Sequence, residues 1–149
     1  MSKYSFFISQ NEQDYHPEVG CGVAALMMLL KASDTTPLPE WRKLCGQLNL
    51  TAPPELKGYS SNNPATGLYP EDLFKFVIRA QLPFRMHFFD SEWEECLQKA
   101  PIMVLMAGHE EEFGEDGHWI VLLKKDKDTF TYLDPWYKSN EQYERLISV

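Results

Sequence analysis

The stretch from Cys21 to Lys31 consists almost entirely of small or unbranched apolar residues and shows almost no polar face. This composition predicts a helix that is buried on most sides. Weaker patterns predict three further helices: one over residues 39–48 with a proline near its first turn, one from Pro70 to about Ala80, and a short one that is capped by Asp90 or Ser91 and reaches Lys99.

Short β-prone runs separated by polar turns dominate the second half of the chain. We expect strands over Phe84–Phe89, Ile102–Ala107, His118–Lys124 and Thr129–Asp134. Ile102–Ala107 is apolar throughout, which favours a central strand covered on both faces. Tyr4–Ser9 is also β-prone, and the tail from Tyr137 is expected to add a last helical turn. Helices mostly precede strands, so the predicted fold class is α+β, with a helical half packed against an antiparallel sheet.

Length, charge and cysteine content narrow the class of protein. A chain of 149 residues suits one domain, 1–149, and the proline-rich residues 51–66 are interpreted as a loop within it. The net charge of -8 argues against nucleic acid or an anionic membrane as partners. Three cysteines without metal-site spacing favour free thiols in a reducing compartment. With neither a signal peptide nor ~20 consecutive apolar residues, we expect a cytoplasmic protein without membrane insertion, or one exported as an effector.

Cys21 is the first candidate for chemistry, because it stands where Gly20 breaks the chain and the buried helix begins. The N–H groups at a helix N-terminus favour a thiolate, which is the nucleophilic form of cysteine. Gly22 leaves room for a substrate backbone to approach. The alternative is a small core residue on an apolar helix, and for a cysteine considered alone this interpretation is favoured.

A second candidate lies at the other end of the chain, where His118 begins one expected strand and Asp134 ends the next. A hairpin folded at the polar turn Lys125–Asp128 pairs His118 with Asp134 directly, with Cβ atoms ~5 Å apart. The same register places Ile120 opposite Tyr132 and Leu122 opposite Phe130, on one apolar face. A histidine beside a carboxylate at a strand end has the geometry of an oriented base. The alternatives are an ordinary surface pair and a register shifted by one residue.

Several short motifs, in order along nearly the whole chain, resemble the C39-like peptidase family of papain-like cysteine peptidases. They are Phe6–Gln10, Gly20–Leu26, Gly67–Leu73, Pro101–Leu105, Gly117–Val121 and Asp134-Pro135. In that family a strand leads to a glutamine, a Cys-Gly pair opens the central helix, and an Asp-Pro pair follows the catalytic histidine.

The resemblance implies a papain-like fold and hydrolysis of peptide bonds through a thioester, without a metal or cofactor. Cys21 would be the nucleophile, His118 the general base and Asp134 the residue that orients the histidine. Gln10 would donate its amide to the developing oxyanion together with the Cys21 backbone N–H. Gln10 lies further upstream of the cysteine than the family pattern leads us to expect, and Gln13 is a competing candidate.

Other functions compatible with the same three residues are those of an amidase, a glutamine deamidase or an acyltransferase, including a bacterial effector or toxin domain. A non-catalytic binding module is the third class, and it is expected to lose the nucleophile. A peptide or protein is the expected substrate, and the sequence leaves its identity and the oligomeric state open.

Residues outside this set have simpler interpretations. The acidic loop from His109 to Gly117 is expected to be solvated, although it would also favour basic substrates or raise the pKa of His118. A metal site with His109 and His118 lacks the spacing of common zinc motifs. Trp119 and Trp136 either shield the histidine and aspartate from water or simply pack. The remaining thiols, Cys45 and Cys96, are expected in the core.

Overall fold

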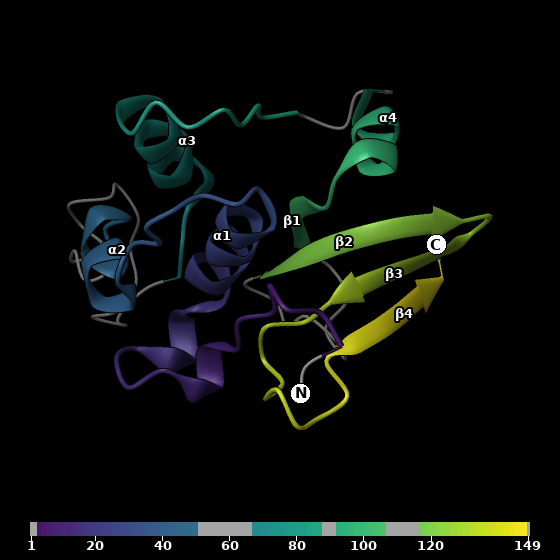
Figure 1. Cartoon of the computed structure of the whole chain (residues 1–149), viewed down its shortest axis with the longest axis horizontal. Coiled ribbons are helices and arrows are strands. Elements are labelled where there is room, and N and C mark those ends of the chain that lie inside the picture. Colours follow the sequence, from purple (N-terminus) through teal and green to yellow (C-terminus); the bar gives the residue numbers. More distant parts are fainter. Residues whose placement is uncertain (1–2, 51–66, 88–91, 107–116, 149) are drawn as a thin grey trace.

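The computed structural model describes residues 3–50, 67–87, 92–106 and 117–148. Four α-helices precede four β-strands in this part of the chain (Figure 1). The helices are α1 (Cys21–Ala32), α2 (Trp41–Gln47), α3 (Pro70–Arg79) and α4 (Glu92–Lys99), and two 3-10 turns, η1 (Gln10–Glu12) and η2 (Pro17–Val19), lie before α1. The strands are β1 (Ile102–Met106), β2 (His118–Asp126), β3 (Thr129–Leu133) and β4 (Glu144–Ser148). The predicted α+β class is confirmed as far as the content of helices and an antiparallel sheet is concerned.

The strands of the described residues form one antiparallel sheet in the order β1-β2-β3-β4, with helices on both faces. Alternate residues of β2 divide between two apolar clusters. Trp119 and Val121 pack with α1 and α2 in the larger cluster. Ile120 and Leu122 pack with Leu97 of α4 in the smaller one. This alternation follows from the two-residue period of a strand. β2 therefore contributes side chains to the apolar clusters on both faces of the sheet.

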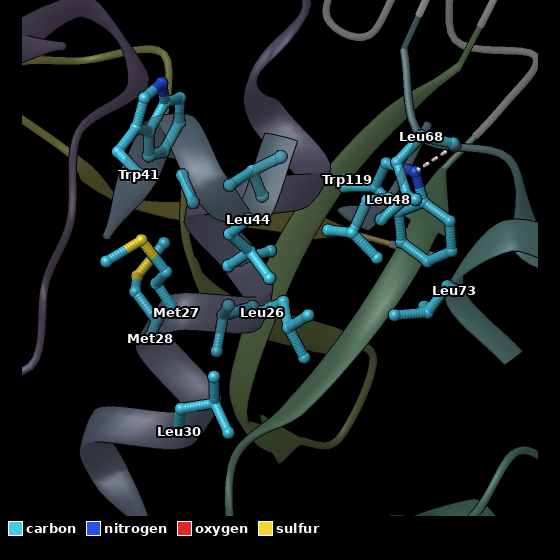
Figure 2. Close-up of a cluster of buried hydrophobic side chains, with 14 of the residues drawn as sticks. Leu26, Met27, Met28, Leu30, Trp41, Leu44, Leu48, Leu68, Leu73 and Trp119 are labelled. Carbon is cyan, nitrogen blue, oxygen red and sulfur yellow. Dashed lines mark hydrogen bonds between the residues drawn. The ribbon is translucent and has the colours of Figure 1, made fainter. Parts of the chain in front are cut away.

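Helix α1 is buried over nearly its whole surface, as its composition predicts. It reaches β2 closely because Gly22 has no side chain. A Cβ at this position would lie 2.5 Å from the Leu68 Cβ and 2.9 Å from the Trp119 Cδ1. The indole N–H of Trp119 donates to the Leu68 carbonyl at 2.8 Å and holds both residues over the helix (Figure 2). The space expected for a substrate backbone at Gly22 is thus filled by the protein itself.

Strand β1 differs from the prediction of a central strand, because within the described residues it lies at the edge of the sheet. Its continuous apolar run has another cause. Met103 and Leu105 pack on the cluster around α1, while Ile102, Val104 and Met106 pack on the cluster around α4. Helices cover both faces of this edge strand, so both sets of side chains are apolar. A continuous apolar run therefore indicates a strand with helices on both faces, but it does not indicate whether that strand is central or at the edge of the sheet.

Three further expectations were wrong. The tail forms strand β4 instead of a helical turn, and it pairs with β3 from Leu133↔Glu144 to Thr129↔Ser148. Residues 84–87, the described part of the predicted strand Phe84–Phe89, have no regular structure, and Tyr4–Ser9 forms a bend and a turn followed by residues without regular structure. β-Propensity reflects fit to a half-buried pleated surface, so a β-prone segment without a strand partner need not become a strand.

Substitution at Gly22 tests the close approach of α1 to β2. Because a Cβ would collide with Leu68 and Trp119, Gly22→Ala should lower the free energy of unfolding by about 1–3 kcal/mol. Gly46→Ala is the matched control, since no atom lies within 4 Å of a Cβ placed at this helical position. The control should be neutral or stabilising by up to about 1 kcal/mol. Urea unfolding measures both, and equal effects of the two substitutions would contradict the close packing.

Candidate active site

Cys21 is the first residue of α1, and Gly20 is its N-cap. No side chain of the described residues caps this helix end, so N–H groups of the first turn are left without the usual partner. Gly20 lies against Trp41, because a Cβ there would be 2.6 Å from the Trp41 Cζ2. The Trp41 indole N–H in turn donates to the Tyr15 carbonyl at 2.7 Å. The turn before Cys21 is thereby held against α2, and the partly buried thiol stands at the positive end of a buried helix.

His118 and Asp134 form a short hydrogen bond, 2.6 Å between Nε2 and Oδ1, with side chains that are 13% and 6% exposed. His118 is the first residue of β2, and Asp134 directly follows β3. The same Oδ1 accepts the backbone N–H of Trp136 at 3.0 Å, and the Asp134 N–H donates to the Tyr143 carbonyl at 2.9 Å. The carboxylate is thus fixed in place by its own turn and by the segment that leads into β4.

The predicted His118–Asp134 pair forms, but through a different register from the one expected. The observed ladder pairs Val121 with Leu133 and Leu122 with Tyr132, and a bulge shifts it between Leu122 and Lys124. The hairpin turn lies at Lys127 and Asp128, later than predicted, and Lys127 adopts a positive φ of 53°. Asp134 therefore meets His118 diagonally and not from the directly opposite position. The expected apolar face of Ile120, Leu122, Phe130 and Tyr132 is nevertheless present in the cluster around α4.

The Cys21 side chain lies close enough to His118 to influence the pKa of its ring. Because Asp134 occupies Nε2, Nδ1 is the ring nitrogen left for the thiol. Burial of the ring lowers the pKa of His118, but the hydrogen bonds to Asp134 and Cys21 and their charges outweigh this and raise the pKa to about 9. The protonated imidazole is therefore the stable form at neutral pH, between a carboxylate and a sulfur. Residues from the two ends of the chain, Cys21 on one side and His118 with Asp134 on the other, therefore meet at one site.

Gln10 lies close to these residues but points its amide elsewhere. Its Nε2 donates to the Pro17 carbonyl at 2.7 Å, and its backbone N–H donates to the Pro135 carbonyl at 2.8 Å. The residue is 1% exposed, whereas an oxyanion donor must face the substrate. Gln13, the competing candidate, donates to the Ser9 carbonyl at 3.0 Å within its own turn. The oxyanion role of either glutamine stays a prediction.

The backbone N–H of Trp136 is a contact to the site that the sequence prediction missed. An aspartate that accepts the N–H two residues onward makes a turn typical of Asp and Asn, and the Asp-Pro-Trp sequence carried that signal. The two tryptophans themselves differ. Trp119 is buried beneath α1, while Trp136 is 50% exposed beside Asp134. Packing accounts for Trp119, and Trp136 keeps an aromatic face in solvent.

The other two thiols have different surroundings. Cys45 is fully buried in the core, and burial raises its pKa to about 11. Cys96 is only partly buried, with its Sγ 3.8 Å from the Nε2 of His87, so the prediction of a core position holds for Cys45 alone. His109 and most of the acidic loop lie outside the described residues. Within residues 3–50, 67–87, 92–106 and 117–148, no cluster of three or more His, Cys, Asp or Glu residues suits a metal ion.

Comparisons of the chain with protein-family models, with curated proteins and with solved structures found no match. In the described parts of the chain, none of the helices has the length and apolar character that crossing a membrane requires. Cys21, His118 and Asp134 are therefore the residues whose geometry bears on function.

Removal of the Asp134 charge tests the electrostatics of this site. Asp134→Asn keeps the size of the side chain but takes away the carboxylate that stabilises the imidazolium. We expect the pKa of His118 to fall from about 9 toward its ordinary value near 6.5, as followed by NMR titration of the ring. Glu18→Gln is the control, because it removes a carboxylate 3.5 Å from the partly exposed His16 and should leave His118 unchanged.

The same pKa predicts how stability depends on pH. The pKa of His118 is higher in the folded protein than in the unfolded chain, so protonation of its ring stabilises the fold. This stabilisation is complete below about pH 6.5 and is lost as the pH rises through about 9. The free energy of unfolding should therefore fall across this window, by an amount on the order of 3 kcal/mol. His118→Gln should flatten the profile, as measured by urea unfolding at several pH values. A wild-type profile equal to that of His118→Gln would exclude the raised pKa.

Proposed function

We propose that the protein is a cysteine peptidase in which Cys21 is the nucleophile, His118 the general base and acid, and Asp134 the residue that orients His118. The observation that carries the proposal is the His118 ring, which is hydrogen-bonded to the Asp134 carboxylate at 2.6 Å and lies close enough to the Cys21 side chain to interact with it. A nucleophile, its base and an orienting group within hydrogen-bond reach are what covalent catalysis requires. The N-terminus of α1 adds partial positive charge beside the sulfur.

A papain-like arrangement is part of the same proposal. In support of it, the nucleophile opens a buried helix that packs on an antiparallel sheet, and the histidine begins a strand of that sheet. The peptide-hydrolase assignment itself comes from the C39-like motifs in the sequence, since the geometry alone is shared by thiol enzymes that act on other amides.

In the first half of the reaction, the Cys21 sulfur, having given its proton to His118, attacks the carbonyl carbon of the scissile amide. The tetrahedral intermediate carries negative charge on the former carbonyl oxygen, and the backbone N–H of Cys21 is a donor available to it. The C–N bond then breaks, and the imidazolium of His118 transfers its proton to the leaving amine. The product is a thioester between Cys21 and the acyl half of the substrate.

In the second half, His118 accepts a proton from a water molecule, and the resulting hydroxide attacks the thioester. The C–S bond breaks, the acid product leaves, and the sulfur and imidazole return to their starting state. Asp134 remains ionised throughout, because its work is to hold the ring with Nε2 toward the carboxylate and to stabilise the charged form.

Thiol labelling tests the nucleophile. Treatment of the folded protein with limiting iodoacetamide at pH 7, followed by peptide mapping, should label Cys21 first. His118→Ala should slow this labelling by about 10-fold or more, because the imidazolium that stabilises the thiolate is lost. Cys96 is the informative competitor, since it is also partly buried and also contacts a histidine. Equal labelling of Cys21 and Cys96, or no effect of His118→Ala, would overturn the proposal.

The reaction itself is tested with protein substrates. Casein and a glutamine-rich protein are incubated with the wild type and analysed by mass spectrometry, with Cys21→Ser as the inactive control. Cleavage that disappears in the control supports a peptidase, and His118→Ala should reduce it by about 10²- to 10⁴-fold. Deamidated glutamine without cleavage would replace the peptidase assignment by a deamidase that uses the same three residues.

A further inference from the structure

Residues 9–12, here named the N-terminal clamp, bind the segment that follows Asp134. The Ser9 hydroxyl and the Gln10 backbone N–H both donate to the Pro135 carbonyl, at 3.4 and 2.8 Å. The Asn11 side-chain amide donates to the Trp136 carbonyl at 2.5 Å. The Glu12 carboxylate accepts the N–H and the hydroxyl of Ser139 at 2.7 and 2.5 Å. Each residue of the clamp therefore contacts the stretch from 135 to 139.

Gln10 also connects the clamp to the other side of the site. Its Nε2 donates to the carbonyl of Pro17, the first residue of η2, at 2.7 Å. The same carbonyl accepts the N–H of Gly20 at 3.3 Å, and Gly20 is the N-cap of α1 directly before Cys21. Gln10 thus bonds through its backbone to the residue after Asp134 and through its side chain to the turn before Cys21. In Figure 1 the purple N-terminal segment runs between α1 and the loop that joins β3 to β4.

The burial of Gln10 shows that this connection is not incidental. The residue is 1% exposed, and its Oε1 has no hydrogen-bond partner among the described residues. Buried polar side chains without a full set of partners are rare, because they lose their hydration on folding. An apolar side chain of similar length would avoid that loss. Unlike an apolar side chain, the Gln10 amide donates a hydrogen bond from its Nε2 to the Pro17 carbonyl.

We propose that the N-terminal clamp positions the segment after Asp134 against the turn before Cys21, and that Gln10 is the positioning residue at its centre. The inference rests on the proposed cysteine-hydrolase function. Cys21 and Asp134 interact with the same imidazole ring from two segments far apart in the sequence, so the separation of these segments sets the distance of His118 from both side chains. The clamp bonds to both segments and limits that separation.

Alkylation by iodoacetamide distinguishes a positioning role from an oxyanion role. In this reaction the sulfur displaces iodide and forms a C–S bond, and no tetrahedral oxyanion arises. Loss of an oxyanion donor therefore leaves the alkylation rate unchanged and slows amide hydrolysis alone. Loss of positioning slows alkylation as well, because the His118 imidazolium no longer lies at its distance from the sulfur.

The decisive variant is Gln10→Met, which keeps the side-chain length and removes the donor to Pro17. We expect it to slow alkylation of Cys21 by about 10-fold or more, and to move the NMR titration midpoint of His118 toward its ordinary value. Gln13→Met is the matched control, since its amide donates only to the Ser9 carbonyl in the interactions of its own turn. If Gln10→Met is alkylated as fast as Gln13→Met but hydrolyses substrate more slowly, Gln10 is an oxyanion donor and the positioning role is overturned.

A second variant keeps the test valid if Gln10→Met unfolds, which circular dichroism reports. Asn11→Ala combined with Glu12→Ala removes two exposed contacts of the clamp and leaves the core intact. It should also slow alkylation by about 10-fold, and a wild-type rate would overturn the proposal. Failure of the proposed function looks different: the wild-type Cys21 would then react no faster than Cys96. If Cys21 of the wild type is labelled selectively and the clamp variants react at the same rate, the positioning role of the clamp is excluded while the proposed function stands.

Discussion

The buried carboxylate of Asp134 is the group on which the arrangement of this protein depends. An ionised side chain with so little exposure is tolerated only when hydrogen-bond donors and an opposite charge surround it. The turn to Trp136 supplies a backbone N–H, and the ring of His118 supplies a charged one. The His118 donor requires that β2 and β3 pair in the bulged register, whereas the Trp136 N–H lies in the turn that begins at Asp134 itself. The contact between His118 and Asp134 therefore depends on how β2 pairs with β3.

The approach of the thiol to this pair is set by packing. Helix α1 is lined by small or flexible residues, and two glycines at its start let Trp41 and Trp119 lie directly against the backbone. Such contacts leave little freedom to slide or rotate the helix, because interiors are close-packed. The same apolar packing that stabilises the fold thus fixes the Cys21 end of the helix near His118. The core and the hairpin together place Cys21, His118 and Asp134 near one another.

The hydrophobic and polar pattern of the sequence predicted those features that depend on neighbouring residues. The composition of α1, the strands beside the polar turn and the presence of a His118–Asp134 pair were all readable from the sequence. The register was not, because a bulge lies between Leu122 and Lys124 and the turn at Lys127 adopts a positive φ. The strand at the tail was missed for a related reason. β4 forms on the side of β3 that is not paired with β2, and its pairing with β3 overrides a weak local propensity. The burial of Gln10 likewise depends on contacts with residues more than a hundred positions away.

The long spacing between Gln10 and Cys21, which departs from the C39-like pattern, has a structural use in this chain. The intervening residues form η1 and η2 and include Asn11 and Glu12, which bind the segment after Asp134. A shorter connection would bring a glutamine closer to the nucleophile but would lack these contacts. Extra chain length costs little entropy once it is closed into a loop that packs on the surface. The residues between Gln10 and Cys21 therefore support the two segments that meet at His118.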